Sequence, residues 1–209
     1  MKVKHAGGII GLDVTQGLPR VEELFETRIP KSPSPLTEIS GKVEISEEEN
    51  AWKINVKSVD IKPQEEREYM IPKNVKLLVE NGQLVAAGSQ LSGGPLDIKS
   101  VLAIKGLLSA QEYLIYGIQA VYESQGVPIN DKHIEVIVRK MSDKVQVLTT
   151  GDTNLLPREM IDKNRFTEEN ERVLAVGGEP ATAQVVILGI TKASLHTESW
   201  LSAASFIET

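Results

Sequence analysis

The spacing of apolar residues changes along the chain, and this change constrains the fold more than any other feature. Trp52, Ile54 and Val56 alternate with polar residues, which predicts a strand with one face on a core and one in water. Between residues 97 and 141, apolar residues instead recur every third or fourth position, as in helices. We therefore predict the α+β class: a small β-rich, barrel-like or sandwich-like module at about 36–92, packed with a mixed helix and strand region.

Turn signals divide the β-rich module. Residues 47–50 form an acidic turn before the alternating strand, and residues 75–79 are expected to form a further strand. Asn81-Gly82 favours a type I′ hairpin turn, in which both central residues need positive φ. Residues 41–70 hold five basic and eight acidic residues, a net charge of −3, so this module does not resemble a phosphate-binding surface.

Helix signals lie on both sides of this module. Pro19 suits the first turn of a short helix at residues 19–28. Ser109 with Glu112 fits a capping box for a second helix, which Gly126 would end. A third helix is expected to begin near Asn130-Asp131, and its apolar stripe is Ile134, Ile137, Val138 and Met141.

The last third of the chain mixes both patterns. Residues 144–148 alternate like a strand, and residues 167–176 predict a helix that ends at Gly177-Gly178. Residues 183–190 have the continuous apolar pattern of a buried strand, and a last helix is expected from residue 202.

Composition excludes several kinds of chemistry. The absence of cysteine excludes disulfides, thiolate nucleophiles and cysteine-ligated zinc, and three scattered histidines argue against a histidine metal site. A net charge of −6 argues against a protein that binds nucleic acid by bulk positive charge, although a local basic patch is compatible with it. No apolar run approaches the roughly 18 to 20 residues that cross a bilayer, so we expect a soluble, cytoplasmic protein without a membrane partner.

Two motifs leave alternatives open. The glycine-rich run at residues 7–11 follows no strand and precedes no Gly-Lys-Ser/Thr, so neither a Rossmann nor a P-loop site is predicted. Beside it, His5 is either a mobile acid or cation directed at a phosphate, or an unstructured tail histidine. Residues 85–88 after a hairpin are typical of carrier domains, but the hairpin tip has no lysine. A non-enzymatic barrel-sandwich binding or docking module is therefore the alternative function.

Four stretches together carry a resemblance to a known family. They are residues 13–21 with Leu24-Phe25-Glu26, residues 130–139, residues 188–195 and residues 199–206. In this order they closely resemble the C-terminal part of bacterial DNA-directed RNA polymerase β′ subunits. The resemblance implies a piece of a nucleotidyltransferase that synthesises RNA from nucleoside triphosphates on a DNA template. It also implies that the piece helps to close the active site and lines the downstream DNA channel.

The resemblance assigns roles to segments and residues. Residues 1–35 would be a trigger-loop remnant with the second trigger helix, 36–95 the β-rich jaw module, and 96–209 the jaw and cleft region with the switch segment. Met1 would lie near the base of the incoming nucleotide and His5 near its phosphates. Lys192, Thr191 and Lys31 would contact nucleic acid, with Lys192 near template phosphate. The alternative for Lys192 is a solvated lysine, and we expect Arg139 and Lys140 to form a solvated helix face.

The resemblance also implies cofactors and partners. The family holds its catalytic magnesium ions on an Asn-Ala-Asp-Phe-Asp-Gly-Asp loop, which this chain lacks. The chain alone is therefore expected to be inert, without a cofactor of its own, with magnesium bound elsewhere in the complete enzyme. Expected partners are the rest of β′, the β, α, ω and σ subunits, downstream and template DNA, and nucleoside triphosphate, in the nucleoid-associated cytoplasm.

Overall fold

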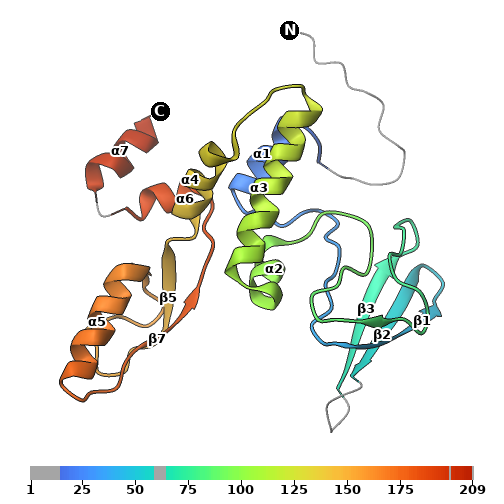
Figure 1. Cartoon of the computed structure of the whole chain (residues 1–209), viewed down its shortest axis with the longest axis horizontal. Coiled ribbons are helices and arrows are strands. Elements are labelled where there is room, and N and C mark those ends of the chain that lie inside the picture. The colour runs from blue at the N-terminus through green and yellow to red at the C-terminus, as the bar shows by residue number, and fades with distance from the viewer. Residues whose placement is uncertain (1–14, 59–64, 198, 209) are drawn as a thin grey trace. The chain divides into compact units, whose positions relative to one another are not determined.

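The chain forms two compact units of mixed helices and strands. The computed structural model describes residues 15–58, 65–197 and 199–208, and these residues form seven helices and seven strands (Figure 1). The described residues of Ile29–Ile104 form the first unit, and Gln16–Arg28 joins the residues from Lys105 onward in the second. The predicted α+β class is confirmed. No helix among the described residues is long and apolar enough to span a membrane.

A curled antiparallel sheet dominates the first unit. Its strands are β1 (Gly41–Glu47), β2 (Ala51–Ser58), β3 (Glu66–Pro72) and the short β4 (Leu84–Val85), in the order β3-β2-β1-β4 (Figure 1). The sheet forms a half-barrel, as the barrel-like pattern at 36–92 predicted. Helix α2 (Ile98–Lys105) follows at the end of this unit.

The alternation at residues 52–56 corresponds to strand β2. Ile54 and Val56 are fully buried and stand opposite Ile45 and Val43 of β1. Trp52 is partly buried at the edge of the same core. The inner face of the sheet thus covers one apolar cluster, formed by Val43, Ile54, Val56, Ile71, Val79, Val85 and Leu91.

The outer face of the sheet carries ion pairs centred on β2. Lys53 Nζ lies 2.8 Å from Glu68 Oε1. Lys57 Nζ lies 2.5 Å from Glu44 Oε2 and 3.9 Å from Glu66 Oε1. Hydrogen bonding to Glu68 raises the pKa of Lys53, and hydrogen bonding to Glu44 raises the pKa of Lys57. The two lysines therefore stay charged and neutralise acids on both neighbouring strands.

The strand predicted at residues 75–79 is wrong, and so is the hairpin. Within that segment the only ladder contact is an isolated bridge between Leu77 and Ser92. Asn81-Gly82 does form a turn, but only Gly82 has positive φ, at 85°, which is the pattern of a type II turn rather than type I′. The chain after the turn pairs with β1 instead of folding back on residues 75–79, because Leu84 and Val85 complete the sheet edge there.

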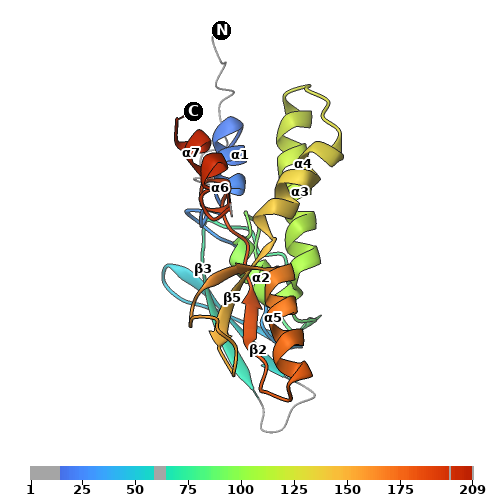
Figure 2. The ribbon, with the colours of Figure 1, turned by 90° about the vertical axis from the view of Figure 1, so that its left-hand side faces the viewer.

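Three helices pack in series in the second unit. They are α1 (Leu18–Phe25), α3 (Leu107–Ser124) and α4 (Asp131–Met141), with α1 against α3 (Figure 1) and α3 against α4 (Figure 2). Leu24 of α1 is 1% exposed, and a Cβ on Gly117 of α3 would lie 3.1 Å from its Cδ1. The two helices therefore approach closely because α3 has no side chain at that position.

Helix ends were predicted with mixed success. Asn130 caps α4, because its Oδ1 accepts a 3.1 Å hydrogen bond from the Lys132 amide, and Gly126 follows the end of α3 with φ of 71°. The Ser109–Glu112 capping box is wrong, because α3 begins at Leu107. Gly106, with φ of 86°, separates α2 from α3, so the new helix starts before Ser109 is reached.

A small antiparallel sheet completes the second unit. Strands β5 (Lys144–Thr149), β6 (Met160–Asp162) and β7 (Thr182–Val185) lie in the order β6-β5-β7, and α5 (Lys163–Ala175) contacts β5 and β6. Their apolar core includes Val145, Val147, Leu155, Ile161 and Ala181.

The strand predicted at residues 183–190 is wrong in its second half. The strand ends at Val185, and α6 (Ile190–Leu195) begins at Ile190, followed by α7 (Trp200–Glu208). Ile187 and Leu188 are nonetheless buried, 8% and 6% exposed. The second half of the apolar run therefore corresponds to a buried connecting segment and not to a paired strand.

The three segments predicted from the resemblance do not coincide with the two units, since residues 16–28 fold with the second unit. The functional division at 1–35, 36–95 and 96–209 stays a prediction.

Candidate functional site

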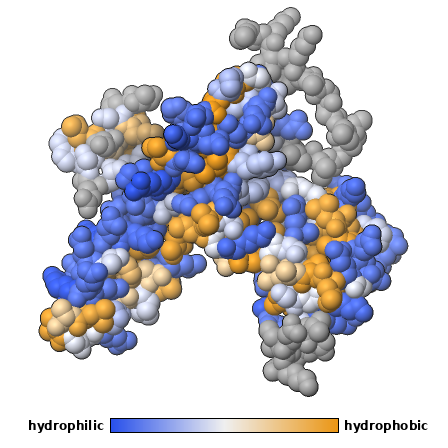
Figure 3. All heavy atoms as spheres, in the orientation of Figure 1, coloured by the Kyte–Doolittle hydropathy of each residue, from blue (hydrophilic) through white to orange (hydrophobic). Residues whose placement is uncertain are grey.

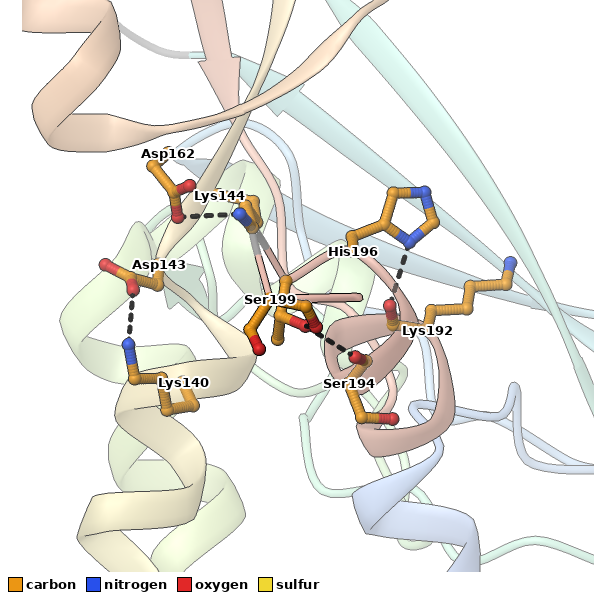
Figure 4. A network of polar contacts seen from close by, with 9 residues as sticks. Lys140, Asp143, Lys144, Asp162, Lys192, Ser194, His196 and Ser199 are labelled. Atoms are coloured by element: carbon orange, nitrogen blue, oxygen red, sulfur yellow. Dashed lines mark hydrogen bonds and ion pairs between the residues drawn. The ribbon is translucent and has the colours of Figure 1, made fainter. Parts of the chain in front are cut away.

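Helix α6 carries two of the residues that the resemblance associates with nucleic acid. Thr191 and Lys192 are both exposed in its first turn. Within the described part of the chain, no carboxylate lies at ion-pair distance from the Lys192 ammonium, whereas Lys140 and Lys144 are paired with Asp143 and Asp162. Figure 4 shows the Lys192 side chain extending away from these two ion pairs. Lys192 is therefore a cation available to an external anion.

Side chains of α6 and of the two residues that follow it form hydrogen bonds at the C-terminal end of the helix. His196 Nδ1 lies 2.8 Å from the carbonyl oxygen of Lys192, within donor distance (Figure 4). The Ser194 hydroxyl donates to the Thr191 carbonyl at 2.9 Å, and the Thr197 hydroxyl donates to the Ser194 carbonyl at 3.2 Å. These bonds stabilise a helix of only six residues, too short to be stable alone.

The N-terminal end of α6 is held by α1. Glu26, the C-cap residue of α1, accepts hydrogen bonds at Oε1 from the Thr191 hydroxyl and, at 3.4 Å, from the Thr191 amide. The Thr191 hydroxyl therefore has a partner inside the protein, and its contact with nucleic acid stays a prediction.

The other predicted site residues belong to other parts of the chain. Lys31 is exposed and belongs to the first unit. Met1 and His5 lie outside the described residues, so their predicted roles are not tested. Arg139 and Lys140 are exposed on α4, and Lys140 Nζ pairs with Asp143 Oδ2 at 3.1 Å, as expected for a solvated helix face.

A groove of about 1050 Å³ lies beside α6, lined by residues of α4, α5, α6 and α7 and of the adjoining strands. Apolar side chains of Ile137, Met141 and Phe206 line it together with the ion pair between Lys144 Nζ and Asp162 Oδ1, 2.6 Å apart. Sequence reasoning missed this groove because its residues come from distant parts of the chain. The one local signal is Ile137, which belongs to the apolar stripe of α4 and yet is 40% exposed.

Helix α7 exposes large apolar side chains. Trp200 is 77% exposed, Leu201 61% and Ile207 71%, and Figure 3 shows apolar surface on this helix. Such a concentration on one short helix is typical of a surface that other protein covers.

The described residues do not fit a metal site. No three histidine, aspartate or glutamate side chains gather closely enough among them to hold a metal ion. Magnesium bound elsewhere in a complete enzyme stays a prediction.

The chain is similar to known proteins over its whole length. The family model described as RNA polymerase Rpb1, domain 5 matches residues 1–198. The chain is 52% identical over 209 residues to DNA-directed RNA polymerase subunit beta' of Thermobifida fusca, and 51% identical to that of Acidothermus cellulolyticus. It is 50% identical to the same subunit of Caldanaerobacter subterraneus subsp. tengcongensis. All of this chain is covered, but only 16%, 16% and 18% of these three relatives.

Proposed function

Because the chain belongs to the RNA polymerase Rpb1 domain 5 family, we propose that it works as part of a DNA-directed RNA polymerase. The polymerase would use nucleoside triphosphates as substrates and DNA as template. The remaining β′ residues and the β, α, ω and σ subunits would be its partners. This proposal is favoured over an independent barrel-sandwich module because the family match extends across both units rather than the β-rich part alone.

Within the polymerase, α6 would present Lys192 to a phosphate of the template strand. One observation carries this assignment: the ammonium of Lys192 is exposed and lacks an acidic partner in the described structure, on a helix fixed at both ends. A lysine held in this way forms a charge-assisted contact with phosphate and releases a condensed counterion. The net charge of −6 is compatible with this role, since a few local contacts suffice.

The finer roles also belong to this proposal. Residues 1–35 would form a trigger-loop remnant with the second trigger helix, in which His5 stabilises charge on the pyrophosphate leaving group and Met1 contacts the base. Residues 36–95 would form the jaw, and residues 96–209 would line the downstream DNA channel. Leu24 packs closely against α3, which supports the proposal that α1 is a fixed base for the trigger-loop segment.

The test replaces Lys192 in the assembled polymerase. Lys192→Ala should weaken the DNA complex and reduce the slope of log affinity against log salt concentration by about 0.9, the loss of one phosphate contact. Lys163→Ala is the matched control, because Lys163 is also exposed and has no acidic partner among the described residues. An unchanged slope in Lys192→Ala would exclude the phosphate contact.

A further inference from the structure

The N-terminus of α6 cannot be capped by its own N-cap residue. That residue is Gly189, which is buried and has no side chain to accept a hydrogen bond from the first turn. Its φ of −61° is accessible to every residue, so the backbone conformation does not require glycine. The lack of space does: a Cβ at this position would lie 2.7 Å from both the Glu26 carbonyl oxygen and Glu26 Oε2.

Glu26 supplies the missing cap from 165 residues away. Its Oε1 accepts from the amide and the hydroxyl of Thr191, the second residue of α6. Helix N-termini leave several amides without an intrahelical partner, and a carboxylate is also attracted to the partial positive charge at this end of the helix. In most helices a serine, threonine or aspartate at the N-cap supplies the accepting oxygen. In α6 the carboxylate of Glu26, at the end of α1, supplies it instead.

The backbone around Glu26 fixes where its carboxylate lies. The Glu26 amide donates to the Glu22 carbonyl at 2.9 Å, which keeps Glu26 attached to the last turn of α1. The next residue, Thr27, has φ of 49°, a conformation that is uncommon for a β-branched residue. This turn places the Glu26 main chain directly against Gly189.

Lys192 follows the capped residue directly. The direction of its Cα–Cβ bond depends on where α6 begins and on the axis of this short helix, and the Glu26–Thr191 contact constrains both. We propose that Glu26 is a positioning residue, which fixes α6 so that Lys192 meets nucleic-acid phosphate. This inference rests on the proposed function of Lys192, and it makes the register of α6 dependent on α1.

The test measures DNA affinity and its salt dependence in the assembled polymerase. Glu26→Ala should weaken DNA binding about threefold to tenfold, in the range expected when a helix cap is lost, and should lower the salt slope. Glu26→Gln keeps an acceptor oxygen and should recover most of the affinity. Glu22→Ala is the matched control, because Glu22 is an exposed acid of the same helix whose partner is Arg28, at 2.8 Å.

The double variant separates positioning from general stability. In a Lys192→Ala background, Glu26→Ala should cost less than twofold, because the contact that Glu26 positions is already absent. An equal cost in both backgrounds would overturn the inference, and so would a normal salt slope in Glu26→Ala beside a reduced slope in Lys192→Ala. If Lys192→Ala itself leaves the slope unchanged, the proposed function fails and the inference fails with it.

Discussion

Replacing Asp162 should destabilise the second unit far more than an ordinary surface substitution. Asp162 stands directly opposite Lys144 in the β5–β6 ladder, and their charged atoms lie 2.6 Å apart. The Lys144 side chain is only 9% exposed, so Asp162→Ala would leave a nearly buried ammonium without its partner. Breaking a buried ion pair costs about 3 to 5 kcal/mol.

The partial exposure of Asp162 lowers the expected energetic cost of Asp162→Ala. The Asp162 side chain is 29% exposed, so water would reach part of the vacated space. We therefore expect a loss of about 2 to 3 kcal/mol in the free energy of unfolding. Hydrogen exchange of the Val147 amide, which donates to the Glu159 carbonyl at 3.0 Å across the β5–β6 sheet, would measure this loss locally.

A neighbouring ion pair provides the control. Lys140 and Asp143 are 76% and 35% exposed, so Asp143→Ala should cost less than about 1 kcal/mol. The double variant Lys144→Met with Asp162→Ala should be more stable than Asp162→Ala alone, because no unpaired charge remains buried. If Asp162→Ala cost no more than Asp143→Ala, or if Lys144→Met gave no recovery, the reasoning would be refuted.

Two further predictions concern the packing of α1 and the sheet of the first unit. Leu24→Ala should cost about 2 to 5 kcal/mol in urea unfolding, because Leu24 is 1% exposed against α3; a loss below 1 kcal/mol would contradict this. Above about pH 10 the first unit should lose thermal stability, because the pKa values of Lys53 and Lys57 are raised by hydrogen bonds to Glu68 and Glu44, and that of Tyr69 by burial. Each stabilising contribution is complete below the ordinary pKa, 10.5 for lysine and 10.0 for tyrosine, and is lost as pH rises through the raised value. Lys57→Met should make the melting temperature fall less steeply with pH in this range. An unchanged dependence of melting temperature on pH in this variant would contradict the prediction.

Local sequence signals predicted the elements that depend on local physics. Ile54 and Val56 alternate because one face of β2 is buried, and Asn130 caps α4 through its own side chain. Residues 75–79 and 186–189 are different, because Val79, Ile187 and Leu188 are buried in connecting segments that lie outside the strands of both sheets. A pattern of apolar residues records burial, and it cannot by itself distinguish these two arrangements.

The candidate site depended on contacts that no local pattern contains. The resemblance directed attention to Lys192 and Thr191, but nothing near either residue indicates that Glu26 holds their helix. Gly189 carries no signal either, since glycine is required there by the close approach of α1 rather than by a turn. The groove beside α6 likewise forms only when four helices and the small sheet come together.

The most direct test of the central claim is reconstitution of a polymerase in which this chain is supplied as a separate polypeptide. The tagged chain would be combined with the remaining β′ residues and the β, α, ω and σ subunits, recovered by pull-down, and assayed for elongation on a DNA template. Our account predicts that the chain joins the complex and that template-dependent RNA synthesis requires it. A well-folded chain that fails to associate, or a complex that synthesises RNA equally well without it, would contradict the account.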